Sequence, residues 1–485
     1  MARLSLSQMG WGLLLLASLL AVPGESPAQT FCTQCLTIRL GRPLVTRGPA
    51  ADELDSPYNE IQLANGQRRG FSSNASSYAV DGSDPWSTGG ARRRVLAPGA
   101  AGTYSDCGQW MNDTEQVSGG VHGFIHAERS CNYGAGQTHK SMAYGWSTDE
   151  GLSWSVRGQI ITGTDAPTPG VVSGEGDCTV IDGKDGYLYA YCLRARDWRT
   201  IVARAPASNP GPGNWMKYFN GAWSQPGLGG DATALGFLGT SAGRWTANGD
   251  VLLLTPDRWF GGLRLSFSSN KVNFTSVGDP LIPLEDDNWS RPAPTELVTY
   301  PSVMNYGDVS NQVGSGFLLT YVYIQPGEGF DKRYLVFRDV WMGVAASPQT
   351  PQVGLALSRW FSATAKDRWT TTAPVVGNYN TYAYDKLLGY VMTKPHPTLP
   401  SNKLEDCVST WPGHPDHLLT NDGMCASAGY TRLRTAGWLY RDAQPNTLPV
   451  YRCYSPTLQS HFASNRADCE GLGTMEWLLG YALAS

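Results

Sequence analysis

Apolar and polar residues alternate in short runs over most of this chain, which is the pattern of half-buried β-strands. From about residue 60 to residue 395 the runs are bounded by Gly, Pro, Asn and Asp, and no long helical period interrupts them. A loose motif recurs there: an apolar strand, a polar turn, then Trp or Phe. Its four copies are Ser141–Asp149 before Trp154, Ile201–Ala205 before Trp215, Leu263–Phe267 before Phe274, and Val353–Ser358 before Trp369.

Weak, widely spaced self-similarity of this kind is typical of radially repeated four-stranded sheets. The four copies and the segment before residue 110 predict an all-β fold, a five-bladed β-propeller whose last blade is closed by N-terminal sequence. A β-sandwich is the competing fold, but sandwiches rarely need so many similar hairpins. We therefore assign residues 29–395 to the propeller.

The pattern changes after Pro395. His396–Asn402 has the Pro-rich composition of a linker. Two related units follow within residues 403–485, because Asp416–Asn421 in the first unit is echoed by Ser460–Asn465 in the second. We expect these units to form a small, β-rich accessory module.

The first residues of the chain have the features of an export signal. A short basic start precedes an apolar run, Trp11–Val22, that is too brief to span a bilayer comfortably, and small residues end at Ala28. We expect a signal peptide over residues 1–28 and secretion to the extracellular space or periplasm, with no membrane contact after cleavage. An uncleaved membrane anchor is the alternative.

Export changes the interpretation of the ten cysteines, because an even number in an exported chain indicates disulfides. Cys32 and Cys35 form a CxxC sequence, but no second CxxC and no βαβ pattern accompanies it. Pairing of these two with other cysteines is therefore favoured, with Cys107 and Cys131 as their partners or as a local pair. The other expected pairs are Cys178–Cys192 across a hairpin, and Cys407–Cys425 and Cys453–Cys469 at matching places in the C-terminal units.

The composition narrows the class of partner. A net charge of −4 gives no electrostatic basis for binding nucleic acid or an anionic membrane. The 17 Trp and 23 Tyr, with only 16% charged residues, favour contact with carbohydrate, because aromatic rings offer flat apolar faces to sugars. Trp and Tyr are also ordinary core residues, so this preference is mild.

Carboxylates at strand beginnings are the candidate catalytic groups, because these positions converge on the axis of a propeller. Glu175 and Asp177 each follow a glycine, where the backbone can approach a ligand; a turn with solvated acids is the alternative. Strand alternation places His126 and Glu128 side by side on one face. Asp81 is an earlier acid.

The candidate substrate-binding residues are aromatic, charged or imidazole side chains near these acids or on a later blade: Trp86, His126, Asp257, Arg258 and Tyr300. Arg258 can bind a substrate hydroxyl or carboxylate, or form a surface ion pair with Asp257. We expect no cofactor and no catalytic metal. The acidic turn over residues 286–288 can hold a structural calcium ion, although it lacks EF-hand spacing.

Two short segments resemble known modules. Ser147–Trp154 resembles the Asp-box of sialidases and other propellers, which in those families is a structural hairpin remote from the active site. Tyr451–Tyr454 and His461-Phe462 resemble the signature of a short repeat of unknown function at the C-termini of many secreted bacterial hydrolases. That resemblance implies a binding or attachment role.

Residues 60–395 are similar to secreted relatives of the five-bladed propeller glycosidases, a group of arabinanases, furanosidases and fructan-active enzymes. Gly174–Asp177, the strand ending at Tyr191 and Trp215–Tyr218 carry the resemblance. It implies three acids from the first blades that act as base or nucleophile, pKa modulator and general acid. By position, Asp81 would be the base or nucleophile, and Glu128 and Asp177 would share the other roles, with Glu175 as a replacement for Asp177.

The expected function is that of a secreted glycoside hydrolase acting on a polysaccharide or cell-wall glycan through paired carboxylates. A non-catalytic carbohydrate-binding propeller is the first alternative. The second is a sialidase-like enzyme, which would need an arginine triad and a nucleophilic tyrosine. The residues that fit this scheme are Arg258, Arg291, Arg338 and Tyr300.

Overall fold

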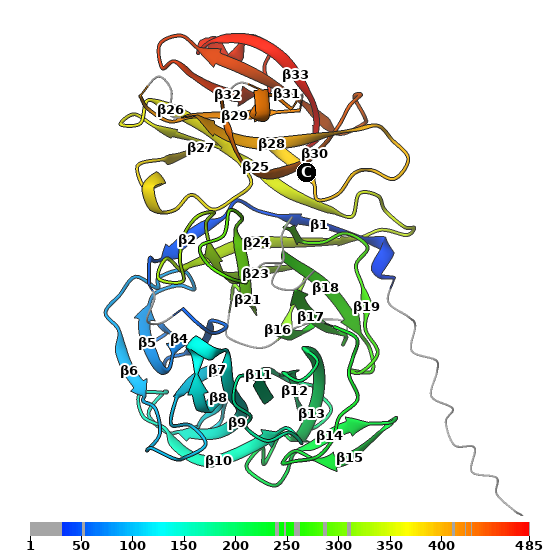
Figure 1. Ribbon diagram of the computed structural model, residues 1–485. Coiled ribbons are helices and arrows are strands. Elements are labelled where there is room, and N and C mark those ends of the chain that lie inside the picture. The colour runs from blue at the N-terminus through cyan, green and yellow to red at the C-terminus, as the bar shows by residue number, and fades with distance from the viewer. Residues whose placement is uncertain are drawn as a thin grey trace, which may run out of the picture. The chain divides into compact units, whose positions relative to one another are not determined.

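The computed structural model describes residues 32–50, 54–237, 242–246, 249–256, 262–284, 289–307, 312–409, 413–421, 423–427 and 429–484. Nearly all regular structure in these ranges is β (Figure 1). The helical elements are single turns: η1 (Thr33–Cys35), η2 (Tyr133–Ala135), η3 (Gly377–Tyr379), η4 (Cys469–Gly471) and α1 (Met424–Ser427). None of the helices described here is long and apolar enough to cross a membrane. The expected signal peptide lies outside the described residues.

The first two blades are antiparallel sheets of four strands each. Blade 1 consists of β3 (Asn59–Gln62), β4 (Arg68–Asn74), β5 (Ser76–Gly82) and β6 (Arg93–Leu96), in that order. Blade 2 consists of β7 (Gly108–Val117), β8 (Gly120–Asn132), β9 (Gln137–Ser147) and β10 (Ser155–Thr162).

The third and fourth blades follow the same plan with extra short strands. Blade 3 consists of β11 (Val172–Asp182), β12 (Tyr187–Arg194), β13 (Arg199–Pro206), β14 (Met216–Phe219) and β15 (Ala222–Pro226). Blade 4 consists of β16 (Ala242–Thr246), β17 (Val251–Pro256), β18 (Gly262–Ser268), β19 (Thr275–Ser276) and β20 (Ile282–Pro283), with β22 (Gln312–Val313) parallel to β16.

N-terminal sequence closes the fifth blade. Its strands β21 (Leu297–Met304), β23 (Gly316–Ile324) and β24 (Tyr334–Val344) are followed by β1 (Leu36–Leu40) and β2 (Leu44–Arg47), which both pair antiparallel with β24. The ring is also closed on the inside, because Ser302 Oγ donates to the backbone carbonyl of Tyr58 at 2.5 Å. The predicted all-β, five-bladed propeller is confirmed, including its closure by the N-terminus.

The inner strands bring the blades together. Contacts run from β3 to β7, from β7 to β11, from β11 to β16 and from β16 to β21. A buried carboxylate links two of them, since Asp113 on β7 accepts from the backbone N–H of Val180 at 2.9 Å and from the Thr179 hydroxyl at 3.1 Å, both on β11. β11 also begins as a parallel neighbour of β9, so blades 2 and 3 form one nine-stranded sheet.

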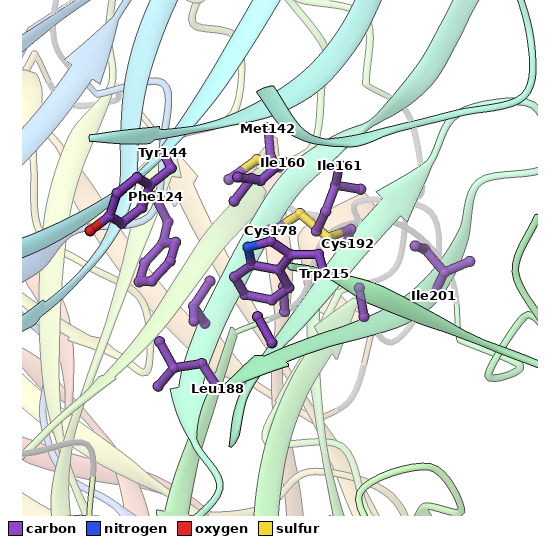
Figure 2. Packing of buried hydrophobic residues seen from close by; sticks show 14 of the residues in the cluster. Phe124, Met142, Tyr144, Ile160, Ile161, Cys178, Leu188, Cys192, Ile201 and Trp215 are labelled. Carbon is purple, nitrogen blue, oxygen red and sulfur yellow. A yellow bond between two sulfur atoms is a disulfide. The ribbon is translucent and has the colours of Figure 1, made fainter. Parts of the chain in front are cut away.

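A large apolar cluster fills the space between blades 2 and 3 (Figure 2). Phe124 from β8 and Trp215 meet edge to face, with ring centroids 6.1 Å apart, and the Cys178–Cys192 disulfide lies among them. Burial of such large side chains gains about 2 kcal/mol each. This core fixes blade 3 against blade 2, which matters because both carry candidate site residues.

The last nine strands form three triplets of a long, a short and a long strand. Their bounds are β25 (Val353–Ser362), β26 (Asp367–Thr371) and β27 (Ala383–Met392); β28 (Ser401–Ser409), β29 (Asp416–Thr420) and β30 (Thr431–Tyr440); and β31 (Thr447–Ser455), β32 (Ser460–Ser464) and β33 (Thr474–Leu483). In each triplet the first strand pairs with the other two. β1 pairs with both β24 and β25, so it joins the first triplet to blade 5 (Figure 1).

The triplets close on one another with pseudo-threefold symmetry. Their third strands pair end to end as Met392↔Trp438, Tyr440↔Tyr481 and Leu483↔Tyr390. Tyr390, Trp438 and Tyr481 each follow a glycine with a positive φ. A Cβ on that glycine would come within 3 Å of a carbonyl oxygen of the neighbouring triplet; the three are Gly389, Gly437 and Gly480. Glycine at this position is therefore what lets the strands approach.

This symmetry corrects one expectation about the repeats. The motif copy Val353–Ser358 before Trp369 is part of the first triplet and not of a propeller blade. An apolar strand that precedes an aromatic residue is common to both kinds of sheet, so the motif does not tell them apart. The expected boundary at residue 395 stays a prediction; it falls between the first and second triplets, so the residues assigned to the propeller from sequence include the first triplet.

All ten cysteines form disulfides in the structure. The pairs are Cys107–Cys131, Cys178–Cys192, Cys407–Cys425 and Cys453–Cys469, together with Cys32–Cys35. The expectation that Cys32 and Cys35 pair with other cysteines is wrong. The η1 turn brings their Cα atoms within 5.2 Å, so they bond to each other.

Candidate active site

Charged and polar side chains from four blades gather around Glu128, and the group begins at a pair on β8. His126 and Glu128 lie side by side, as strand alternation predicts, with Nε2 3.1 Å from Oε1. His126 Nδ1 accepts the backbone N–H of Asp177 at 3.0 Å. Because Nδ1 is an acceptor, the ring proton lies on Nε2 and is donated to Glu128.

Lys140 connects Glu128 to the acid of the next blade. Its Nζ lies 2.8 Å from Glu128 Oε1 and 2.9 Å from Asp177 Oδ2. The three side chains are at least 88% buried, since their exposed fractions are 12%, 6% and 10%. A buried ammonium group shared by two carboxylates is a strong interaction only when such hydrogen bonds are made.

The third acid of the group is Asp55, which lies in the segment before β3. Its Oδ1 lies 2.9 Å from Arg333 Nη2 and accepts the hydroxyl of Tyr300 at 3.2 Å. The negative charges of Glu128 and Asp177 raise the pKa of Asp55, and the positive charges of Arg333 and Lys140 lower it. We call Asp55, Glu128, Asp177, Lys140 and His126 the acid cluster.

Irregular backbone conformations orient the side chains of Asp177 and Tyr300. Asp177 has a φ of 50° and Tyr300 a φ of 47°, values that bulky non-glycine residues seldom adopt. Each lies at a shift in strand register, between Gly176 and Thr179 on β11 and between Thr299 and Ser302 on β21. Bulges of this kind redirect a side chain, and left-handed non-glycine residues concentrate at functional sites.

The glycines around Glu175 serve the packing of the acid cluster. A Cβ at Gly176 would lie 2.5 Å from His126 Nδ1, and one at Gly174 would lie 2.1 Å from the carbonyl oxygen of Lys140. From sequence alone, these glycines are expected to let the backbone approach a ligand closely. In the structure the backbone instead approaches His126 and Lys140.

The environments of the acids push their ionisation in opposite directions. Burial raises the pKa of Asp55, the charge of Arg333 opposes this, and the charges of Glu128 and Asp177 add to the rise. Burial also acts to raise the pKa of Glu128, but Lys140 and His126 outweigh it and hold that pKa well below its usual range. Two carboxyls with diverging affinities for a proton are what acid–base catalysis needs.

Tyr133, in the η2 turn, lies over Glu128. Its hydroxyl donates to Glu128 Oε2 at 2.6 Å, while 60% of the residue is exposed. Burial of the hydroxyl end, together with the charge of Glu128, raises the pKa of Tyr133. The exposed ring can therefore offer an apolar face to a ligand beside the carboxylate.

The structure brings together only some of the residues expected from sequence. Glu128, Asp177, His126 and Tyr300 belong to one group, whereas Asp81 does not join it. Asp81 lies on β5, 46% of its side chain is exposed, and Arg69 binds both of its oxygens at 2.6 and 2.7 Å. That ion pair lowers the pKa of Asp81.

Other expected site residues lie elsewhere. Glu175 is buried and paired with Lys217 at 2.6 Å, and Trp86 lines a cavity of about 310 Å³ between blade 1 and blade 5. Asp257 and Arg258 lie outside the described residues. The guanidinium of Arg338 donates hydrogen bonds to the hydroxyl of Tyr321 and to the carbonyl oxygens of Gly41 and Thr372. These contacts hold strands and loops together and do not form a sialidase-like arginine triad.

Four residues of this region were missed from sequence: Asp55, Tyr133, Lys140 and Arg333. Asp55 has a recognisable signal, because it is an acid in the short segment before Asn59, where the first inner strand begins. Lys140 and Arg333 have none, since an isolated basic residue in a sequence is usually solvated. Among the described residues no group of three His, Cys, Asp or Glu side chains is arranged to hold a metal ion.

No family model matches the chain, and no curated protein matches it in sequence. Among solved structures, it is similar to an alpha-L-arabinofuranosidase from Lactobacillus brevis, with 11% identity and a TM-score of 0.40 over 60% of this chain and 92% of that one. It is also similar to a family 117 glycoside hydrolase from the marine bacterium Zobellia galactanivorans, with 11% identity and a TM-score of 0.42 over 66% of this chain and 94% of that one. For the GH43_1 enzyme from Xanthomonas citri complexed with xylose, the identity is 15% and the TM-score 0.39 over 64% of this chain and 92% of that one. The chain is thus similar in structure, at low identity, to glycoside hydrolases.

Proposed function

We propose that this chain is a glycoside hydrolase in which Asp55 is the general acid and Glu128 is the ionised carboxylate, acting as base or nucleophile. One observation carries the proposal: two carboxyls from neighbouring blades lie in one cluster, and their surroundings shift their pKa values in opposite directions. Cleavage of a glycosidic bond needs one protonated and one ionised carboxyl on either side of the bond.

Each residue of the cluster then has a role that its contacts support. Asp55 would protonate the leaving oxygen, with Tyr300 and Arg333 fixing its orientation. Glu128 would act on the anomeric carbon directly or through a water molecule, held by His126 on one oxygen and Tyr133 on the other. Asp177 would complete the set of three acids and share Lys140 with Glu128.

The substrate proposed is an extracellular polysaccharide or cell-wall glycan, and the protein is proposed to be secreted. Five disulfides support an oxidising compartment, and the exposed ring of Tyr133 beside Glu128 suits stacking against a sugar. The three triplets from β25 to β33 are proposed as an accessory module, one triplet larger than the two-repeat module expected over residues 403–485.

Paired variants test the assignment of the acid. Asp55→Asn should reduce release of oligosaccharides from plant, fungal or bacterial cell-wall polysaccharides by roughly a hundredfold or more, because a general acid contributes on that scale. Asp81→Asn discriminates between this assignment and the one expected from sequence. If Asp81→Asn abolishes cleavage and Asp55→Asn does not, the proposed roles are wrong.

A non-catalytic carbohydrate-binding propeller is the second candidate, favoured by one observation. Lys140 contacts both Glu128 and Asp177, so two of the three acids are partly neutralised by one cation. That protein would bind glycans in a saturable way and release no product. An isothermal titration together with a reducing-end assay on the same polysaccharide separates the two candidates.

A further inference from the structure

We propose that Lys140 is a positioning residue of the acid cluster, and that its ammonium group, held between Glu128 and Asp177, sets which acid of the cluster holds the proton. This inference rests on the proposed function, because it concerns the same reaction. It goes further in assigning control of the site to a cation.

The position of Lys140 is fixed by two strand ladders. On β9 it pairs with Glu128 of β8 on one side and with Gly174 of β11 on the other. Its side chain therefore leaves the sheet between the two strands that carry Glu128 and Asp177. Its 12% exposed fraction leaves little access to water, so the two carboxylates are its main partners.

A second buried lysine shows what a purely structural arrangement looks like. Lys217 also pairs with an acid of β11, Glu175, at 2.6 Å. Its remaining hydrogen bonds go to the carbonyl oxygens of Thr162 and Gly230 at 2.7 and 2.6 Å. Lys217 thus ties strands and loops together, whereas Lys140 donates hydrogen bonds to two acids of the cluster.

The charged groups around the three acids determine how removal of Lys140 would change the protonation of Glu128. Glu128 faces Lys140, His126 and Tyr133; Asp177 faces Lys140 and His126; Asp55 faces Arg333 and Tyr300. Without Lys140, Glu128 and Asp177 would lie close together with no cation between them. Two such carboxyls share one proton, so Glu128 would be protonated over a wider pH range.

The inference predicts a shift in the pH dependence of catalysis. Activity needs ionised Glu128 and falls as pH drops through its pKa, and Lys140 keeps that pKa low. In Lys140→Met, the acidic limb of kcat/KM should move to higher pH by roughly one to three units, the range known for paired charges. Lys140→Arg should keep the limb near its wild-type position, because it retains the cation.

Lys217→Met is the control, since it removes another buried lysine that pairs with an acid of β11. It should lower stability and leave the acidic limb where it is. Lys140→Gln, a second neutral variant, serves if Lys140→Met does not fold. A folded neutral variant at residue 140 with an unmoved acidic limb would overturn the inference.

A direct titration separates this inference from the proposed function. Carboxyl carbons of Glu and Asp can be labelled with ¹³C and followed by NMR in wild-type protein and Lys140→Met, with Glu128→Gln to assign the signal. A rise in the pKa of Glu128 without any hydrolysis would keep the role of Lys140 in ionisation and refute catalysis. No rise in an active enzyme would refute the role of Lys140 alone.

Discussion

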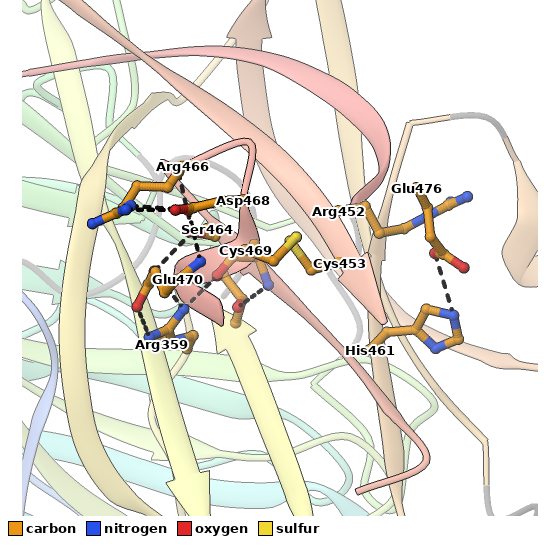
Figure 3. Close-up of a disulfide and its surroundings, with 12 residues drawn as sticks. Arg359, Arg452, Cys453, His461, Ser464, Arg466, Asp468, Cys469, Glu470 and Glu476 are labelled. Carbon is orange, nitrogen blue, oxygen red and sulfur yellow. Dashed lines mark hydrogen bonds and ion pairs between the residues drawn. A yellow bond between two sulfur atoms is a disulfide. The ribbon is translucent and has the colours of Figure 1, made fainter. Parts of the chain in front are cut away.

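Arg359 on β25 binds Glu470, which lies 111 residues later in the η4 turn, through two hydrogen bonds of 3.0 and 2.9 Å (Figure 3). The guanidinium also reaches Asp385 at 2.6 Å through Nε. This contact joins the first triplet to the third. The corresponding positions on the other first strands are Asp406, which binds Thr371 of the first triplet, and Arg452, which binds Thr420 of the second. Each triplet is therefore linked to the one before it around a closed ring.

Loss of Arg359 should open this ring. Arg359→Met leaves Glu470 without its main cation, and breaking a buried pair by removing one partner costs about 3 kcal/mol. The free energy of unfolding, measured by urea denaturation followed by tryptophan fluorescence, should fall by that amount. Arg466→Met is the control, because its ion pair with Asp468 is exposed (Figure 3) and should contribute little. Equal effects of both variants would contradict the role given to Arg359.

His461 should make the stability of the triplets depend on alkaline pH. Burial acts to lower its pKa, but Asp416 at 2.9 Å and Glu476 at 3.5 Å outweigh it and raise the pKa to about 9. A folded pKa above the usual 6.5 stabilises the protein fully below pH 6.5, and this contribution is lost as pH rises through 9. The thermal midpoint should fall between pH 7 and 10, and His461→Gln should flatten that fall. An unchanged slope in the variant would show that other groups cause it.

The propeller could be predicted from the sequence because its signals are local. Strand alternation, turn residues and the spacing of aromatic residues each depend on a few neighbours, and they predicted the propeller and its closure by N-terminal sequence. One of the four motif copies counted toward the five blades, Val353–Ser358, lies instead in the first triplet. The first triplet was missed for a related reason. It has no cysteine pair and carries Arg368 where the other triplets have His417 and His461, so it lacks the cysteines and the histidine that the two later repeats share.

The acid cluster was predicted only in part, because it depends on long-range geometry. Alternation was enough to place His126 beside Glu128. Asp81 is expected from its early place in the chain, whereas the acid that joins the cluster is Asp55, in the segment before β3 of blade 1. No local pattern indicates that Lys140 would lie between acids from two strands, since this follows from the pairing of β9 with both β8 and β11.

Gly176 should be essential although it has no functional group. Gly176→Ala places a Cβ 2.5 Å from His126 Nδ1, which must displace the ring and with it the hydrogen bond to Glu128. We expect at least a tenfold loss of kcat/KM, since small misplacements of catalytic groups are costly. Gly314→Ala, where nothing lies within 4 Å of the added carbon, should retain activity. Full activity in Gly176→Ala would contradict the close packing described here.

Two substitutions at Tyr133 should separate its hydroxyl from its ring. Tyr133→Phe removes the 2.6 Å hydrogen bond to Glu128 and should lower kcat with little change in KM. Tyr133→Ala also removes the exposed apolar face and should raise KM as well. Steady-state kinetics on one soluble polysaccharide measure both. An unchanged KM in Tyr133→Ala would mean that the ring does not contact the substrate.

The most direct test of the account is the release of reducing ends from polysaccharides by wild-type protein and by Glu128→Gln. Asp331→Asn, at an exposed position of the propeller, serves as the control. The account predicts release by the wild type and by the control, and a loss of roughly a hundredfold or more in Glu128→Gln. Equal release by all three proteins, or no release by the wild type from any polysaccharide that it binds, would contradict it.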